Sequence, residues 1–208
     1  MRPLPRLHAV TTHRVLALPD FRVRVAAIVS AGPAVALHVR DKLTCDRDLY
    51  QTAERLLAHA RPPEASIFVN GRPDMAGALR AQGLQLGVRD LSPRQARATF
   101  ATGWIGASVH DETEARRAID EGADYLVAGS IFRTVTHPDQ SPAGLDLIYR
   151  LVGLGLPVIA IGGITPDRVD SVFRAGAYGV AAVSALWQTR DSGAAALSLL
   201  EPWMQADD

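Results

Sequence analysis

The sequence lacks most of the features that define specialised protein classes. Its only cysteine, Cys45, has no partner for an intrachain disulfide, which excludes a disulfide-stapled scaffold. The 22 Lys and Arg residues are balanced by 22 Asp and Glu residues, so no excess positive charge points to nucleic acid or an anionic membrane surface. No apolar run approaches the roughly 20 residues that span a bilayer, and no signal-peptide pattern opens the chain. We therefore expect a cytoplasmic protein that binds neither nucleic acid nor membrane.

What is present is an ordinary globular composition with a repeating pattern. Of the 208 residues, 48% are hydrophobic and 21% are charged, which is close to the average for soluble domains. Short apolar runs occur at 7–11, 34–40, 66–70, 84–86, 103–107, 125–128, 157–161 and 179–183, alternating with helix-like segments near 20–30, 45–60, 72–82, 92–101, 111–121, 142–153, 165–175 and 189–203. Eight strand–helix repeats predict a single (β/α)₈ TIM barrel domain over residues 1–208. A doubly wound sheet is the alternative, but the glycine fingerprint expected after its first strand is absent.

Glycines follow the seventh strand, and a small hydroxyl residue follows the eighth. The candidates are Gly162 and Gly163 at one loop and Val183 and Ser184 at the other. In a barrel these loops lie side by side at the C-terminal rim, where backbone N–H groups commonly bind a phosphate. The pair of loops predicts a phosphate site, although either loop alone would equally fit a tight turn.

The second strand ends in a run of basic residues. Alternation along the strand places His38, Arg40 and Lys42 on one face, toward the barrel mouth if the apolar residues between them face the helices. The alternative is a solvated pair of Arg40 and Asp41 at the strand end.

Polar side chains close the third, fourth and fifth strands as well. Asn70 could bind a heterocycle through the hydrogen-bond donor and acceptor of its amide, or it could cap the following helix. Asp90 could pair with a ring amine or hold a cation. Ser108 and His110 can both reach the mouth, and His110 is a candidate proton carrier because histidine titrates near neutral pH. Its alternative role is that of an ordinary residue at a helix start.

The longest connection, residues 129–142, follows the sixth strand and is rich in hydroxyl groups. A loop of this length in a compact domain is usually functional or disordered. We expect a lid over the mouth that begins at Ser130 and offers Thr134, Thr136 and His137 to a phosphate or pyrophosphate. An insertion without function is the alternative.

Together these segments resemble the thiamine phosphate synthase/TenI family of small barrels. The resemblance covers nearly the whole chain and rests on the motifs HVRDK at 38–42, VNGR at 69–72, LQLG at 84–87, IGASVH at 105–110, GSIFRTVT at 129–136 and AIGGI at 160–164, with further matches at 7–11, 123–125 and 183–184. The family has two branches, which differ in their chemistry.

The synthase branch couples a hydroxymethylpyrimidine pyrophosphate to a thiazole phosphate with the help of Mg²⁺. The positions that match its pattern are Arg40, Lys42, Asn70, Asp90, Ser108, Thr134 and Thr136. Three positions depart from it: His38 replaces a glutamine, Gly71 replaces a magnesium-binding aspartate, and His137 replaces a lid lysine. With Asp90 as the only carboxylate, both metal binding and stabilisation of the leaving pyrophosphate are weakened.

The TenI branch, which aromatises a thiazole phosphate by proton transfer without Mg²⁺, resembles this chain at His38 and at Asn70-Gly71-Arg72. Its catalytic histidine is missing here, because Ser130 stands in that place. Our first hypothesis is a thiazole tautomerase without a metal or cofactor, in which His38 or His110 carries the proton. His38 is favoured because the nearby Arg40 would keep its imidazole neutral.

Two alternatives remain open. The first is a thiamine phosphate synthase that uses Arg40, Lys42 and Asp90 with Mg²⁺. The second is a noncatalytic regulator that binds thiazole phosphate. The resemblance also implies a homo-oligomer.

Overall fold

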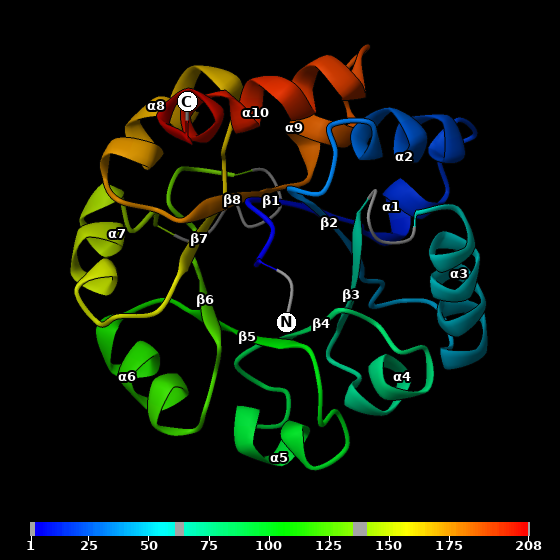
Figure 1. The fold of residues 1–208 in the computed structure, drawn as a ribbon, viewed down its shortest axis with the longest axis horizontal. Coiled ribbons are helices and arrows are strands. Elements are labelled where there is room, and N and C mark those ends of the chain that lie inside the picture. The colour runs from blue at the N-terminus through cyan, green and yellow to red at the C-terminus, as the bar shows by residue number, and fades with distance from the viewer. Residues whose placement is uncertain (1–2, 61–64, 135–140, 208) are drawn as a thin grey trace.

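The (β/α)₈ barrel predicted from the sequence is confirmed. The computed structural model describes residues 3–60, 65–134 and 141–207. Eight parallel strands form a closed barrel in chain order, and the helices surround it (Figure 1). The strands are β1 Leu7–Val10, β2 Val35–Val39, β3 Ser66–Asn70, β4 Gly83–Leu86, β5 Trp104–Val109, β6 Tyr125–Ala128, β7 Val158–Ile161 and β8 Gly179–Ala182. Each coincides with one of the predicted apolar runs.

The helices follow the predicted segments with two additions. They are α1 His13–Leu16, α2 Phe21–Val29, α3 Asp46–His59, α4 Pro73–Ala78, α5 Pro93–Arg97, α6 Glu112–Asp120, α7 Leu145–Val152, α8 Pro166–Arg174, α9 Ser184–Trp187 and α10 Ser192–Asp207. The additions, α1 and α9, are each four residues long, which is too short to produce a helical period in the sequence. Side-chain caps fix several helix starts: for example, Ser92 forms a capping box with Gln95 at α5, and Asp111 accepts the N–H of Glu114 at α6.

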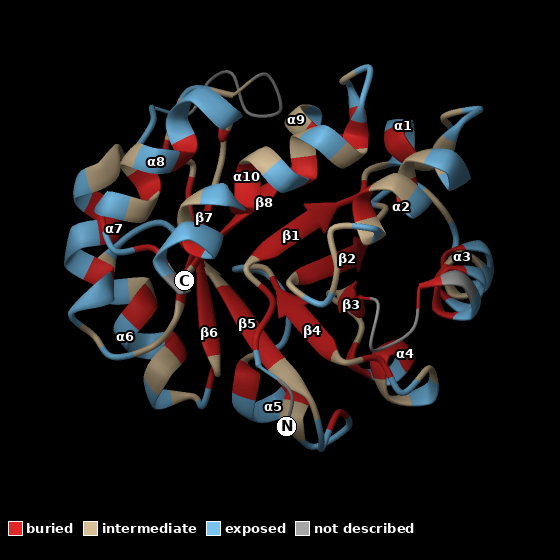
Figure 2. Cartoon of the chain, turned by 45° about the horizontal axis from the view of Figure 1, so that its top comes forward, coloured by how far each residue is buried: buried red, intermediate tan, exposed pale blue. Residues whose placement is uncertain are grey.

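Residue alternation along each strand creates two separate cores. One set of side chains packs between the strands and the surrounding helices. The other fills the barrel interior and includes Phe68, Tyr125 and Ile159. Figure 2 shows the strands as almost continuously buried, whereas the helices are buried along one stripe only. The strands therefore have both faces covered, as parallel sheets require.

Glycines on two strands make room for large rings inside the barrel. Gly83 lies opposite Phe68, and Gly106 lies opposite Tyr125, in the strand register. A Cβ atom at either glycine would collide with the ring beside it. This pairing of a large residue with a missing side chain lets the rings fill the narrow interior at normal packing density.

No helix in the described part of the chain is long and apolar enough to cross a membrane.

Candidate active site at the mouth of the barrel

Most of the predicted site residues that the structure describes lie at one end of the barrel. Because all eight strands are parallel, their C-terminal ends share a single rim, which is the site of catalysis in barrel enzymes generally. A cavity of about 220 Å³ beside the β4–α5 loop is lined by residues that include Asp90 and Ser108. A larger cavity of about 490 Å³ lies at the opposite end, near Arg6 and Trp203, and holds none of the predicted residues. The candidate residues that the sequence predicts belong to the rim, so the larger cavity does not mark the candidate active site.

Arg40 is held at the end of β2 by Thr11, the residue that follows β1. The Arg40 N–H donates to Oγ1 of Thr11 at 2.9 Å, and this oxygen also lies 2.9 Å from the carbonyl oxygen of His38. Burial lowers the pKa of the half-buried Arg40 side chain, and the carboxylates of Asp41 and Asp90 act in the opposite direction. Arg40 therefore presents a cation to the mouth within the electrostatic reach of Asp90.

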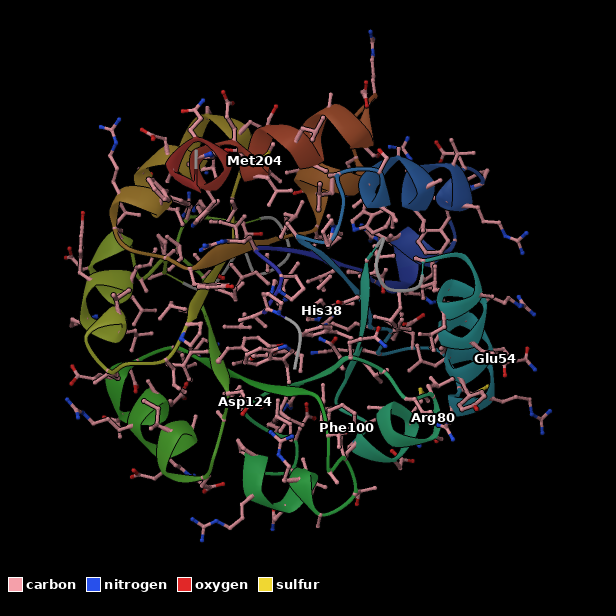
Figure 3. The ribbon with its side chains drawn as sticks, in the orientation of Figure 1. His38, Glu54, Arg80, Phe100, Asp124 and Met204 are labelled. Carbon is pink, nitrogen blue, oxygen red and sulfur yellow. The ribbon has the colours of Figure 1, made fainter. Side chains whose placement is uncertain are left out.

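His38 points into the barrel interior (Figure 3). Its side chain is buried, with 1% exposure, and both of its ring nitrogens are engaged. Nε2 lies 2.7 Å from Nδ1 of His8, and Nδ1 lies 3.0 Å from Oδ1 of Asn70. Burial lowers the pKa of His38 to about 4, with a smaller contribution from the charge of Arg40. His38 is thus neutral at pH 7, but burial rather than Arg40 is the main cause.

Asp90 and Gly71 lie against each other at the rim. The Asp90 carboxylate accepts the N–H of Gly87 at 2.7 Å, and a Cβ atom at Gly71 would lie 3.2 Å from Asp90 Oδ2. The described residues contain no group of three His, Cys, Asp or Glu side chains that could hold a metal by themselves. A single carboxylate still fits Mg²⁺, since this ion commonly uses one or two carboxylates together with substrate phosphates.

Ser108 is oriented from inside the barrel. Gln85 Nε2 donates to Ser108 Oγ at 3.1 Å and also lies 3.1 Å from the carbonyl oxygen of Leu86. Because Ser108 accepts this hydrogen bond, its own hydroxyl hydrogen is available to a ligand.

The glycine loop after β7 packs against the beginning of the β6–α7 connection. Gly162 and Gly163 have φ values of 99° and 64°, which strongly favour glycine. A Cβ atom at Gly162 would lie 2.7 Å from Ser130 Cβ. Within the described residues, neither the N–H of Gly163 nor that of Ser184 donates a backbone hydrogen bond. Both N–H groups belong to the loops at which the sequence predicts a phosphate site, and Val183 precedes Ser184 as the N-cap of α9.

The structure does not bring every predicted residue into this group. The exposed ring of His110 turns away to Glu114, with Nδ1 3.0 Å from Oε2, because a carboxylate one helical turn on competes for it. Lys42 is exposed in the β2–α3 connection, and Thr134 is half-buried near the start of the β6–α7 connection. Thr136 and His137 lie outside the described residues.

Two residues in this arrangement were not singled out by the sequence, one in β1 and one directly after it. His8 is fully buried beside His38, and Thr11 secures the end of β2. The available signal for His8 was a histidine inside an apolar strand, a pattern that fits an ordinary core histidine equally well. Its pairing with His38 depends on how the strands align, which one strand alone does not reveal.

Comparison with known proteins gives concordant results. Residues 7–186 match the TMP-TENI family, described as thiamine monophosphate synthase. A thiamine-phosphate synthase of Thermus thermophilus is 39% identical over 173 residues, covering 82% of this chain and 84% of that protein. One of Chloroflexus aurantiacus is 35% identical over 196 residues, covering 93% and 90%. The structure of a thiamine phosphate pyrophosphorylase from Pyrococcus furiosus has a TM-score of 0.82 at 33% identity and covers 96% of both chains.

Proposed function

The chain belongs to the thiamine monophosphate synthase (TMP-TENI) family, and from this premise we propose that it is a thiamine-phosphate synthase. It would join a hydroxymethylpyrimidine pyrophosphate to a thiazole phosphate and release pyrophosphate. The observation that carries the proposal is the placement of Arg40 within electrostatic reach of Asp90 at the barrel mouth. The relatives from Thermus thermophilus and Chloroflexus aurantiacus carry the synthase name, so the synthase, rather than the tautomerase that we first expected, is the better-supported reading.

Each side chain at the mouth would have its own role in this reaction. Arg40 would bind the pyrophosphate, and Lys42, which is exposed in the β2–α3 connection, would approach it from that loop. Their charge would stabilise the pyrophosphate as the carbon–oxygen bond breaks and the bond to the thiazole forms. When Mg²⁺ is bound, it neutralises charge on the leaving pyrophosphate, and Asp90 would hold it. Ser108 and Asn70 would orient the pyrimidine.

The thiazole phosphate would bind at the ends of β7 and β8, and β1 lies between β8 and the strand that ends at Arg40. The N–H groups of Gly163 and Ser184, at the ends of β7 and β8, would donate to its phosphate oxygens. This arrangement leaves the pyrophosphate and the phosphate in separate subsites, as a coupling of two phosphorylated substrates requires.

The test is a coupling assay on the purified protein. Both substrates are mixed with Mg²⁺ or with a chelator, and the formation of thiamine phosphate and the release of pyrophosphate are followed. We expect equal amounts of both products, formed only with Mg²⁺. The variant Asp90→Asn should raise the Mg²⁺ concentration needed, whereas Asp74→Asn, which removes an exposed partner of Arg72, should not. Coupling that proceeds equally well with the chelator would contradict the role of Asp90.

The thiazole tautomerase remains the second candidate, and Gly71 favours it, because a reaction without Mg²⁺ needs no second carboxylate. Its weakness is the proton carrier. Both nitrogens of His38 are engaged and its pKa is about 4, while the ring of His110 faces Glu114. Aromatisation of the thiazole tautomer without pyrimidine or Mg²⁺ would establish this activity. Tight binding of thiazole phosphate without either reaction would instead indicate a regulator.

A further inference from the structure

A chain of hydrogen-bonding groups runs through the barrel interior to the mouth. Nε2 of His8 lies 3.0 Å from the carbonyl oxygen of Pro5. Nδ1 of His8 lies 2.7 Å from Nε2 of His38, and Nδ1 of His38 lies 3.0 Å from Oδ1 of Asn70. The exposed fractions of His8 and His38 are 0% and 1%, so water does not compete for these contacts. Asn70 stands at the end of β3 and is half-buried, with the mouth beyond it.

Counting hydrogens along this chain fixes the tautomers of both rings. The Pro5 carbonyl can only accept, so His8 Nε2 must carry a hydrogen. A neutral imidazole has one N–H, which makes His8 Nδ1 an acceptor and forces His38 Nε2 to donate to it. If His38 is neutral, its Nδ1 then has no hydrogen and requires a donor from Asn70.

Whether the oxygen or the nitrogen of the Asn70 amide faces His38 therefore depends on whether the histidine pair carries one additional proton. In the structure, the amide oxygen Oδ1 faces His38 Nδ1. With a neutral histidine pair and this tautomer of His8, the amide must make a half turn about its Cβ–Cγ bond, so that its nitrogen faces His38 Nδ1 and its oxygen faces the mouth. Contact between His38 Nδ1 and Asn70 Oδ1 requires an additional hydrogen on Nδ1, which makes the pair cationic. The two orientations of the amide thus belong to two protonation states.

The surroundings of the two rings favour the neutral pair near pH 7. The rings face Phe68 from β3 and Tyr125 from β6, whose ring centroid lies 5.6 Å from that of His8. Arg40 is the charged group that acts on His38, and it disfavours a second cation. Burial raises the pKa of Tyr125 well above its usual value, so it stays uncharged. Burial likewise lowers the pKa of His8.

We propose that His8 is a positioning residue that acts through His38 to turn the amide oxygen of Asn70 toward the barrel mouth, and that uptake of one proton by the histidine pair reverses this amide. In the neutral state, Asn70 then accepts a hydrogen bond from an N–H or O–H group of the ligand. The hydrogen count itself depends only on the barrel interior. The consequence for ligand binding rests on the proposed function, in which Asn70 faces the pyrimidine.

The tautomers can be read directly by ¹⁵N NMR of the ligand-free protein labelled at histidine. At pH 7.5 we expect both buried rings to carry hydrogen on Nε2 and a bare Nδ1, and below about pH 4 we expect His38 Nδ1 to gain a hydrogen. The His8→Gln and His38→Gln variants assign the signals. A neutral His38 with its hydrogen on Nδ1 at pH 7.5 would overturn the proposal, whether or not the protein is a synthase.

Two variants of His8 separate positioning from packing. Glutamine at this position can still donate to the Pro5 carbonyl and accept from His38, whereas leucine can do neither. We expect His8→Leu to weaken binding of the pyrimidine pyrophosphate about tenfold in calorimetry and His8→Gln to restore most of it. Binding of thiazole phosphate, whose proposed contacts at the ends of β7 and β8 do not include Asn70, should stay unchanged in both. Equal losses in the two variants, or equal losses for both ligands, would reject the positioning role.

If the unaltered protein does not bind the pyrimidine pyrophosphate at all, the proposed function fails. The NMR measurement then still decides the tautomers of His8 and His38. The two proposals can therefore fail independently.

Discussion

At the scale of single residues, the most consequential position is a glycine at the rim. Gly71 has a φ of 72°, in the left-handed region that Asn and Asp tolerate better than other residues with side chains. Its missing side chain would point at the Asp90 carboxylate, 3.2 Å from Oδ2. In the synthase pattern that this chain resembles, a magnesium-binding aspartate stands at this position. The backbone is thus shaped to place two carboxylates together, although the sequence supplies one.

Gly71→Asp should therefore strengthen Mg²⁺ binding in the coupling reaction. A second carboxylate beside Asp90 adds a ligand of the kind Mg²⁺ prefers, and we expect the Mg²⁺ concentration for half-maximal rate to fall roughly tenfold. The measurement is the initial coupling rate across a Mg²⁺ titration. Gly71→Asn is the matched control, because it fits the same backbone region without the charge. An equal fall in both variants would show that the carboxylate is not responsible.

Thr11 illustrates a residue whose contribution is indirect. Its hydroxyl joins the end of β1 to the backbone of His38 and Arg40. Thr11→Val removes these hydrogen bonds while keeping the shape, so we expect a loss of roughly 1–2 kcal/mol in the free energy of unfolding. The KM for the pyrimidine pyrophosphate should also rise several-fold. Urea denaturation and steady-state kinetics measure the two effects.

The control for this prediction is Thr52→Val on α3, since the exposed hydroxyl of Thr52 donates only to the carbonyl of Asp48 within the same helix. We expect it to change neither quantity appreciably. A KM that is unaffected in Thr11→Val despite the loss of stability would separate the strand end from substrate binding.

At the scale of elements, the loops after β7 and β8 depend on close approach of the backbone. A Cβ atom at Gly163 would lie 2.6 Å from the carbonyl oxygen of Arg133 and 2.8 Å from Phe132 Cβ. Neither neighbour is the flexible end of a side chain, so a substitution must displace one of the two loops. Gly163 is therefore favoured for two reasons: its φ is positive, and a side chain would not fit between the two loops.

The proposed phosphate site makes a direct prediction for ligand binding. Thiazole phosphate should bind at least about 100-fold more tightly than the unphosphorylated thiazole alcohol, since each charge-assisted hydrogen bond contributes roughly 1.5–3 kcal/mol. Gly163→Ala should remove much of this difference. Gly155→Ala, at a φ of 90° with no atom within 4 Å of the added Cβ, controls for backbone strain alone. Equal affinities of the unaltered protein for the two ligands would eliminate the phosphate site.

The elements also show how far sequence reasoning reaches. The apolar runs predicted all eight strands, and parallel topology then placed their polar ends on one rim without further information. The direction of each side chain was harder to predict. His38 and His110 both stand at strand ends, but the strand register turns His38 inward to His8, while Glu114 draws His110 outward. Such choices depend on neighbours from other elements, which spacing within one strand does not reveal.

At the scale of the whole molecule, the titratable side chains inside the barrel are buried, and burial disfavours their charged forms. His8, His38 and Tyr125 are all buried there, and burial shifts the pKa of each toward its neutral form. The carboxylates with shifted pKa values, including Asp20, Asp41 and Asp74, behave oppositely, because their pKa values are lowered. The interior histidines and these carboxylates therefore respond to acid in different pH ranges.

This separation predicts how stability depends on pH. The pKa of His38 is about 4 in the folded protein and about 6.5 in the unfolded chain. Between these values the unfolded chain binds more protons, so the free energy of unfolding falls as the pH falls from about 6.5 toward 4, by about 3 kcal/mol for this residue. The carboxylate contributions are lost only below about pH 4, where the unfolded Asp side chains become protonated. Urea denaturation at pH 7 and pH 4.5 measures the difference. His38→Gln should markedly reduce this difference in the free energy of unfolding, whereas His110→Gln, at an exposed site, should leave it nearly unchanged. A pH dependence that persists unchanged in His38→Gln would place the responsible group elsewhere.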